Sequence, residues 1–322
     1  MQNYSIFNLI KNAFTNHQNW DLAWKDPTPK KEYDVVIIGG GGHGLATAYY
    51  LAKEHNITNV AIIEKGWIGG GNVGRNTTII RSNYMHDENA LFSEFGMNLW
   101  RKMSQDLNYN VMFSPRGIIN LAHSDAQMNA YARRGNSMRL NGIDALLLNR
   151  EQVKEIIPMA DFSDNVRFPI FGGLMQPSAG TARHDAVAWG YARQADSMGV
   201  DIIQNCEVTG FDISAGKIKG VRTSRGDIKV KKVGLCVAGS TNILAEKLNM
   251  TLPIETHLLQ ACVSEPVKPI LDRVVTFGAG HFYISQSDKG EMVMGGDLEG
   301  YNSYAQRGNL PTLQHVLTEG IA

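Results

Sequence analysis

Three glycines and one glutamate near the start of the chain have the spacing of a dinucleotide-binding site. Gly39, Gly41 and Gly44 form the pattern GxGxxG directly after the apolar run YDVVII. In this pattern the first glycine permits a tight turn, the second admits a pyrophosphate, and the third lets a helix pack closely on a strand. Glu64 follows 20 residues after Gly44. A carboxylate at that distance can accept hydrogen bonds from the hydroxyl groups of an adenosine ribose.

A strand, a turn and a helix are needed to hold these residues. The run YDVVIIGGGGHGLATAYYLAKEH passes from a β-branched strand through the glycines into a helix with Leu45, Ala48, Tyr49 and Ala52 on one side. The N–H groups and the dipole of that helix stabilise negative charge without a lysine. A second strand, NVAIIEK, ends in Glu64. This second strand favours dinucleotide binding over a glycine-rich turn in an unrelated α/β protein.

The loop after Glu64 bears on which dinucleotide binds, because FAD and NAD present the same adenosine diphosphate half to a glycine turn. The loop, KGWIGGGNVGRNTTIIRSNY, places several polar residues in a short stretch: Arg75, Asn76, Thr77, Thr78 and Arg81. An ordinary NAD-binding domain would continue into further regular βα units. A loop this long and polar can run along an extended flavin, which favours FAD.

His184 lies in a second segment with chemical potential, TARHDAVAWGYAR. Val187, Tyr191 and Ala195 follow it at helical spacing, so we expect a helix to begin near Thr181. In a first turn, the unpaired N–H groups and the helix dipole disfavour protonation of an imidazole and leave a neutral nucleophile. Such a nitrogen can attack an activated flavin methyl group. From the residues alone, a histidine in a first helical turn is usually an ordinary surface or capping residue.

The composition argues against several classes of partner. The number of lysines plus arginines equals the number of aspartates plus glutamates, at 31 each, so the net charge is zero and does not attract nucleic acid. The three cysteines are too widely spaced for a CxxC site and the histidines lack ligand spacing, so we expect no metal. No apolar run approaches the roughly 18 residues that span a bilayer, and no signal peptide is visible. We therefore expect a soluble, cytoplasmic protein without a membrane partner.

The pattern predicts an α/β fold with an interleaved architecture. A Rossmann-like FAD-binding domain of the glutathione-reductase type alternates with an α+β substrate domain built on an antiparallel sheet. The expected divisions are an N-terminal arm at 1–32, FAD-binding parts at 33–110 and 181–250, and substrate-domain parts at 111–180 and 251–322. The arm carries an amphipathic helix, with Ile6, Leu9, Ile10 and Phe14 at helical spacing. We expect it to pack on its own domain or another subunit, with a membrane anchor as the alternative.

Several segments together resemble the β subunit of heterotetrameric sarcosine oxidase, within the amine-oxidizing, D-amino acid oxidase-like flavoprotein superfamily. The resemblance rests on PKKEYDVVIIGGGGHGLATAYYLAKEH, GNVGRNTTIIRSNY, TARHDAVAWGYAR, GVDIIQNCEVTGF and FYISQSDKGEMVMGGDLEGYNSYAQRG. It implies a complex with α, γ and δ subunits that oxidatively demethylates sarcosine. Tetrahydrofolate would accept the one-carbon unit, giving methylenetetrahydrofolate, and O2 would accept the electrons, giving H2O2. The β-type subunit would hold FAD non-covalently and FMN covalently, with NAD in the large partner subunit.

The resemblance also implies roles for individual residues. The FAD contacts that carry over are Gly42, His43, Glu64, Asn72, Arg75, Thr77, Ile80 and Val208, the last through its backbone. The segment around His184 matches the family's flavinylation segment, which implies that His184 carries the FMN. Aligned on TTIIRSNY, Arg81 falls where the superfamily holds the substrate carboxylate, and a guanidinium can do this through two parallel hydrogen bonds. The alternative is that Arg81 merely pairs with a nearby acid or phosphate.

The end of the chain departs from the family pattern. The sequence stops at QHVLTEGIA, in an expected helix. The family's β subunits continue into a glycine-rich, flavin-contacting segment, which in relatives supplies a lysine near the substrate carboxylate. We therefore expect the C-terminal part to be missing and the sequence to be a fragment. Two alternatives remain open: another amine-oxidizing flavoenzyme, such as dimethylglycine dehydrogenase or glycine oxidase, or a truncated, non-catalytic flavin-binding subunit.

Overall fold

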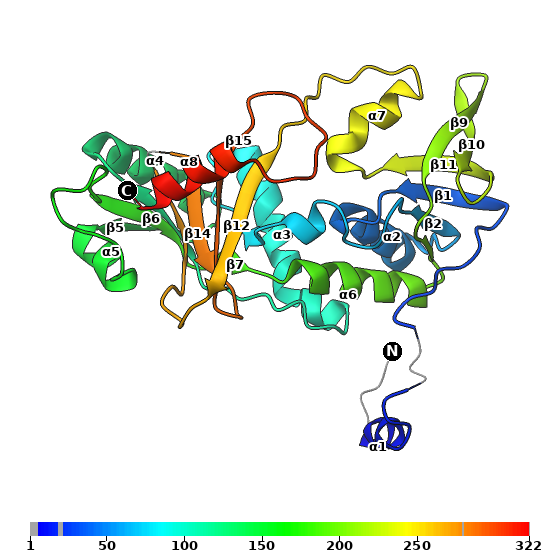
Figure 1. Ribbon diagram of the computed structural model, residues 1–322, viewed down its shortest axis with the longest axis horizontal. Coiled ribbons are helices and arrows are strands. Elements are labelled where there is room, and N and C mark those ends of the chain that lie inside the picture. The colour runs from blue at the N-terminus through cyan, green and yellow to red at the C-terminus, as the bar shows by residue number, and fades with distance from the viewer. Residues whose placement is uncertain (1–5, 19–21, 279, 322) are drawn as a thin grey trace. The chain divides into compact units, whose positions relative to one another are not determined.

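The computed structural model describes residues 6–18, 22–278 and 280–321, and it divides the chain into two compact units (Figure 1). Unit 1 comprises Met1–Asn76, Gln105–Val111 and His184–Ile254. Unit 2 comprises Thr77–Ser104, Met112–Arg183 and Glu255–Ala322. Each unit is therefore assembled from three separate stretches of chain, so the fold is interleaved.

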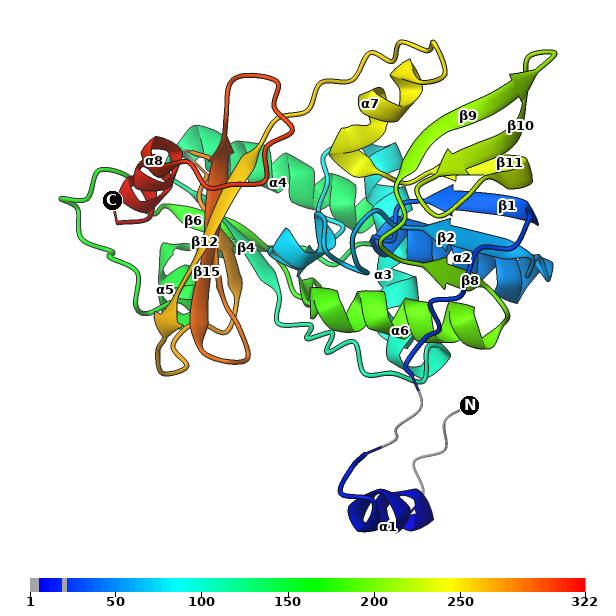
Figure 2. The ribbon, with the colours of Figure 1, turned by 45° about the vertical axis from the view of Figure 1, so that its right-hand side comes forward.

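Unit 1 is built on a six-stranded sheet. Its strand order is β8 (Asp201–Ile203), β2 (Val60–Ile63), β1 (Glu32–Ile38), β11 (Ile228–Leu235), β10 (Lys217–Thr223) and β9 (Val208–Ser214). The first four strands run parallel, and β10 and β9 are antiparallel additions. Figure 2 shows β9, β10 and β11 side by side at one edge of this sheet. A parallel core with an antiparallel extension is the Rossmann-like arrangement that the sequence predicts.

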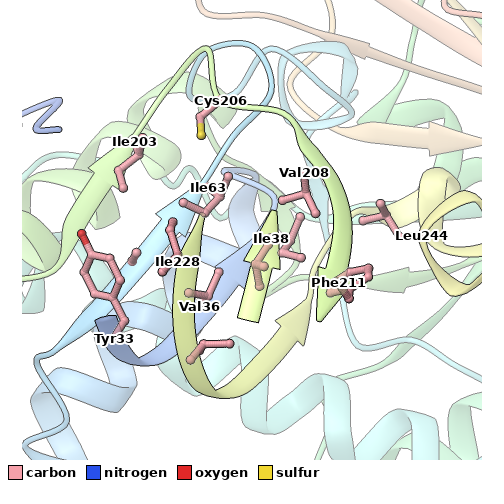
Figure 3. Packing of buried hydrophobic residues seen from close by; sticks show 13 residues of the cluster. Tyr33, Val36, Ile38, Ile63, Ile203, Cys206, Val208, Phe211, Ile228 and Leu244 are labelled. Carbon is pink, nitrogen blue, oxygen red and sulfur yellow. The ribbon is translucent and has the colours of Figure 1, made fainter. Parts of the chain in front are cut away.

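The predicted first strand forms because its apolar residues are buried on both faces of the sheet. Val36 of β1 is fully buried, and all four residues of β2 are buried. Continuous apolar runs of this kind are typical of parallel strands that are covered on both sides. Figure 3 shows the cluster around Val36, Ile38 and Ile63, which also contains Val208 and Phe211 of β9.

The helices of unit 1 follow the predicted pattern. They are α1 (Ile6–Phe14), α2 (Gly42–His55), α6 (His184–Ser197) and α7 (Thr241–Glu246), with the short 3-10 helices η1 (Val73–Arg75) and η2 (Ala238–Ser240). The α2 helix buries the predicted face of Leu45, Ala48, Tyr49 and Ala52. It packs on α6, where the rings of Tyr49 and Tyr191 lie 5.4 Å apart. The amphipathic α1 also forms, with its apolar side chains exposed.

Unit 2 is built on a seven-stranded, largely antiparallel sheet. Its order is β12 (Leu259–Pro266), β15 (Glu291–Leu298), β14 (Phe282–Gln286), β13 (Val274–Thr276), β4 (Ile118–Ala122), β6 (Gly172–Gln176) and β5 (Leu146–Asn149). The strands β3 (Ile79–Ile80) and β7 (Gly180–Thr181) form a separate pair. The helices are α3 (Asp87–Asp106, mostly in unit 2), α4 (Asp125–Leu140), α5 (Arg150–Ile156) and α8 (Leu310–Ile321). The predicted antiparallel sheet and its helices are therefore present.

One strand of unit 2 is shorter than the sequence suggests. The strand β4 begins only at Ile118, although the residues before it, from Asn110 on, include apolar side chains. Pro115 provides no N–H group for a ladder, and Gly117 has a φ of 88°, which turns the backbone out of an extended path. Ser114 instead makes an isolated bridge with Thr181.

Candidate functional site

The glycine turn of unit 1 has close backbone approaches at its first and third glycines. Gly39 has a φ of 109°, and a Cβ atom there would collide with the carbonyl oxygen of Cys236 at the end of the neighbouring strand β11. A Cβ atom on Gly44 would collide with the carbonyl oxygen of Gly39. These two positions therefore require glycine for turning and packing.

The middle of the turn is less crowded, in contrast. A Cβ atom placed on Gly41 or Gly42 would lie 3.7 or 3.6 Å from Val73 Cγ2, its nearest neighbour. Gly41 is the N-cap residue of α2 and has no side chain to bond the first N–H groups of the helix. The N–H groups of the first turn, those of Gly42 and His43 among them, have no carbonyl partner within α2 and lie at its positive end. This geometry fits a pyrophosphate.

Glu64 directly follows β2 and binds the N–H groups of two loops. Its Oε2 accepts a hydrogen bond of 2.8 Å from the N–H of Gly40, and its Oε1 accepts one of 2.8 Å from the N–H of Gly66. An ionised carboxylate has about four lone-pair positions, so two remain for ribose hydroxyls. The sequence indicates the ribose role of Glu64 but not its bonds to the two loops.

The glycine-rich loop after β2 folds back on itself. Arg75, at the end of η1, donates from Nη1 to the carbonyl oxygens of Gly70 and, at 3.0 Å, Gly71. Asn72 precedes η1 as its N-cap residue.

Val208 lies two residues after Cys206, whose N–H donates a hydrogen bond of 2.9 Å to the carbonyl oxygen of Glu64. The Val208 side chain is buried in the core, so only its backbone could face a ligand.

His184 is the first residue of α6, which places it in the first helical turn as the sequence predicts. The side chain is partly buried. The α6 helix packs against both α2 and η1, the two elements that border the glycine turn. His184 therefore belongs to the same unit as the glycine turn.

Arg81 lies in unit 2, directly after β3. Its Nη1 donates a hydrogen bond of 2.7 Å to Oδ1 of Asn83, and its Cζ lies 4.4 Å from the centre of the Tyr84 ring. Among the residues that the structure describes, no carboxylate forms an ion pair with Arg81. Beside it is a hollow of about 320 Å³, lined mainly by apolar residues such as Ile80, Phe92 and Phe95. A guanidinium at an apolar hollow suits a small molecule with one carboxylate.

The chain is similar to proteins of known class over nearly its whole length. Residues 34–321 match the family of FAD-dependent oxidoreductases. The sarcosine oxidase subunit beta of Rhizobium meliloti (strain 1021) is 61% identical over 99% of this chain and 76% of that protein. The subunit beta of Rhodobacter capsulatus is 52% identical over 96% of this chain and 74% of that protein. The chain belongs to the sarcosine oxidase β subunit family.

Solved structures of other proteins share the fold. The L-proline dehydrogenase of P. horikoshii has a TM-score of 0.83 at 27% identity, over 90% of this chain and 76% of that chain. The glycine oxidase of Geobacillus kaustophilus has a TM-score of 0.80 at 19% identity, over 90% of this chain and 78% of that chain. The predicted family and fold class are thus confirmed, and the chain is a flavin-dependent oxidoreductase.

The structure distributes the residues predicted for this sarcosine oxidase β subunit site over both units. Unit 1 contains Gly39, Gly41, Gly42, His43, Gly44, Glu64, Asn72, Arg75, His184 and Val208. Unit 2 contains Thr77, Ile80 and Arg81. The Thr77 hydroxyl donates to the Tyr283 hydroxyl at 3.3 Å, and Ile80 pairs with Gly180 in the small sheet.

The sequence does not reveal the side chains that position the segment around Arg81. The next residue, Ser82, is fixed by buried Gln176: the Ser82 N–H donates to Oε1 of Gln176 at 3.0 Å, and Nε2 of Gln176 donates to the Ser82 hydroxyl at 2.6 Å. The Ser82 hydroxyl in turn donates to Glu94 at 2.7 Å. These partners are up to 94 residues apart in the chain, so no local pattern signals them.

Other features of the described residues lie outside this site. A larger hollow of about 1250 Å³ is lined by residues of β9, β10 and β11 and by the start of β1, and no residue predicted for the site lines it. In the described ranges, no group of three or more His, Cys, Asp or Glu residues is placed to hold a metal ion. The helices of the described part of the chain are all too short or too polar to cross a membrane.

Proposed function

We propose that this chain binds FAD at the glycine turn of unit 1 and, as a sarcosine oxidase β subunit, oxidatively demethylates sarcosine. The observation that carries the proposal is the uncapped N-terminus of α2 at Gly41 and Gly42, next to a turn whose Gly40 N–H is bound by Glu64. FAD would supply the two-electron acceptor for the substrate C–N unit. The overall reaction converts sarcosine, tetrahydrofolate and O2 to glycine, 5,10-methylenetetrahydrofolate and H2O2.

The chain's own contribution to FAD binding is largely made by its backbone. The N–H groups of Gly42 and His43 would bind the pyrophosphate, and Glu64 would accept hydrogen bonds from the adenosine ribose. Further contacts would come from Asn72, Arg75, Thr77, Ile80 and the backbone of Val208. The residue ranges 33–110 and 181–250 would form this FAD-binding part, and 111–180 with 251–322 the substrate part.

Arg81 would bind the substrate carboxylate in the catalytic site. Its guanidinium is held from one side by Asn83 and from another by the Tyr84 ring, and the adjacent apolar hollow can receive the methyl group. A sarcosine molecule that enters with an unprotonated amine needs no side-chain base. The protein then contributes position and electrostatics.

We further propose that His184 carries a covalent FMN and that the enzyme works in the cytoplasm as a heterotetramer. The support is the position of His184 at the start of α6, within a chain 61% identical to a sarcosine oxidase subunit beta. The α, γ and δ subunits would be the partners, with NAD in one of them.

The decisive experiment uses the full-length β-type chain co-expressed with its partner subunits. Sarcosine and oxygen should yield peroxide, and acid precipitation should leave one of two flavins attached to the protein. Release of all flavin by acid would remove the assignment of FMN to His184. Faster turnover of glycine or dimethylglycine than of sarcosine would indicate another amine-oxidizing enzyme. Flavin binding without bleaching by any of these amines would indicate a non-catalytic subunit.

A further inference from the structure

Two arginines of unit 2 meet at one asparagine. Arg81 donates from Nη1 to the side-chain oxygen of Asn83 at 2.7 Å, and Arg134 of α4 donates from Nη2 to the backbone oxygen of the same residue. The amide nitrogen of Asn83 donates to Oδ1 of Asn120 at 2.7 Å. Asn83 is only 1% exposed. Its amide is therefore held in one orientation, with its oxygen toward Arg81.

Both guanidinium groups lack an acidic partner. Within the described ranges, no carboxylate forms an ion pair with either arginine, and Nε of Arg134 is buried without a hydrogen-bond partner. Burial lowers the pKa of Arg134, and the positive charge of Arg81 lowers that pKa further. Two partly buried like charges are costly to hold together unless an anion completes the group.

Three of the four acids on the neighbouring helix α3 are bound elsewhere, and the fourth, Glu88, is exposed. Asp106 forms an ion pair with Lys53 at 3.5 Å. Glu94 accepts hydrogen bonds from the Ser82 hydroxyl and from Arg101, with which it forms an ion pair. Asp87 accepts hydrogen bonds from Ser137 and Asn141 at the end of α4. The positive charge at Arg81 and Arg134 is thus left for a ligand.

The hollow next to Arg81 limits the size and character of that ligand. Its volume is about 320 Å³, and Arg81 is the one charged residue among the described residues that line it. The others are mainly aliphatic and aromatic, including Ile79, Phe92 and Trp100. A short aliphatic molecule with a single carboxylate fits both the charge and the lining.

We propose that Arg134 is a positioning residue of the carboxylate site. It fixes Asn83, through which the guanidinium of Arg81 is oriented, and it adds a second positive charge that attracts the carboxylate. The identity of the ligand as an amino acid such as sarcosine rests on the proposed function. The proposal that Arg81 and Arg134 together form a carboxylate site does not rest on the proposed function.

The test compares three variants in the full-length chain within its assembled enzyme. Arg134→Met removes both the charge and the donor, Arg134→Lys keeps the charge, and Arg133→Met changes an exposed neighbour on the same helix. The probes are acetate and its uncharged isostere acetamide, titrated by calorimetry, together with the KM and kcat for sarcosine.

Arg134→Met should weaken acetate binding and raise the sarcosine KM about 10- to 50-fold, since a second nearby charge in a partly buried site has an effect of this order. Acetamide binding should not change, and kcat should stay within about twofold, because Arg134 contacts no reacting atom. Arg134→Lys should recover part of the acetate affinity, but not all of it, because an ammonium cannot reproduce the fork of a guanidinium. Arg133→Met should behave as the unmodified chain.

Equal weakening of acetate and acetamide would overturn the proposal, because it would mark Arg134 as a merely structural residue. Unchanged acetate affinity in both Arg134 variants would overturn it as well. If Arg134→Met fails to fold, Arg134→Lys decides alone: weaker acetate binding with unchanged acetamide binding supports the proposal, and no difference contradicts it. A chain that binds acetate through Arg134 but does not oxidise sarcosine would refute the proposed function and leave the carboxylate site standing.

Discussion

The glycine turn of unit 1 and the Arg81 site of unit 2 are built from different parts of the polypeptide. The turn consists of backbone: Gly39 and Gly44 allow close approaches, and the first N–H groups of α2 have no side-chain cap. The Arg81 site consists of side chains, with Asn83 and Gln176 as its main supports. The backbone site requires that glycines carry no side chain, whereas the side-chain site requires that each hydrogen-bond partner is present.

The largest expected effect is a loss of stability at Gly44 that does not occur at Gly41. Gly44→Ala places a methyl group against the carbonyl oxygen of Gly39, and we expect a loss of roughly 3 kcal/mol or more in the free energy of unfolding. Gly41→Ala, with 3.7 Å of clearance, should cost less than about 1 kcal/mol yet weaken FAD binding strongly. Urea unfolding of the FAD-free chain and FAD titration measure the two quantities. Equal losses of stability in both variants would contradict the division of roles.

Arg81→Ala tests whether Arg81 binds the substrate carboxylate in the side-chain site. Two charge-assisted hydrogen bonds to a carboxylate are worth roughly 3 to 6 kcal/mol, so kcat/KM for sarcosine should fall about 100-fold or more. Most of the loss should appear in KM, and the FAD content should not change. Steady-state kinetics and the flavin absorbance give both values, with Arg133→Ala as the control. An unchanged KM would remove Arg81 from the carboxylate role.

The same contrast explains how much of the molecule the sequence could predict. The strand, turn, helix and Glu64 of unit 1 follow from local spacing, and so does the place of His184 in the first turn of α6. Asn83 is only two residues from Arg81, but Asn120 and Gln176, which bind Asn83 and Ser82, are 37 and 94 positions away from their partners, so no periodicity joins them. Local patterns therefore fixed the backbone site, whereas the side-chain site needed the folded chain.

Gln176→Leu asks how far the side-chain site depends on its buried support. The substitution leaves the N–H and hydroxyl of Ser82 without this buried partner, which should cost about 1 to 3 kcal/mol in the free energy of unfolding. A double-mutant cycle with Ser82→Ala, followed by urea unfolding, isolates the pair. A coupling energy below about 0.5 kcal/mol would show that the two residues act independently.

Two histidines of unit 2 give the smallest expected effect, with opposite signs. Burial lowers the pKa of His123, whose Nε2 accepts a hydrogen bond from the N–H of Gly278 and whose Nδ1 lies 3.1 Å from the carbonyl oxygen of Phe168. The neutral imidazole is therefore favoured by folding. Its stabilisation is complete above the unfolded pKa of about 6.5 and is lost as the pH falls toward the folded value.

His257 is the matched control, because hydrogen bonds to the carbonyl oxygen of Glu299 and to Glu255 raise its pKa. Its stabilisation is present below about pH 6.5 and disappears as the pH rises through the folded value. Urea unfolding between pH 5 and 8 should show that His123→Gln removes part of the acid-induced loss in the free energy of unfolding, whereas His257→Gln increases that loss.

Because the glycine turn contains no histidine bond of this kind among the described residues, hydrogen exchange at Gly278 should respond to acid more than exchange at Gly40. Equal responses at the two N–H groups would show that acid acts on the whole fold instead of on the side-chain contacts of unit 2.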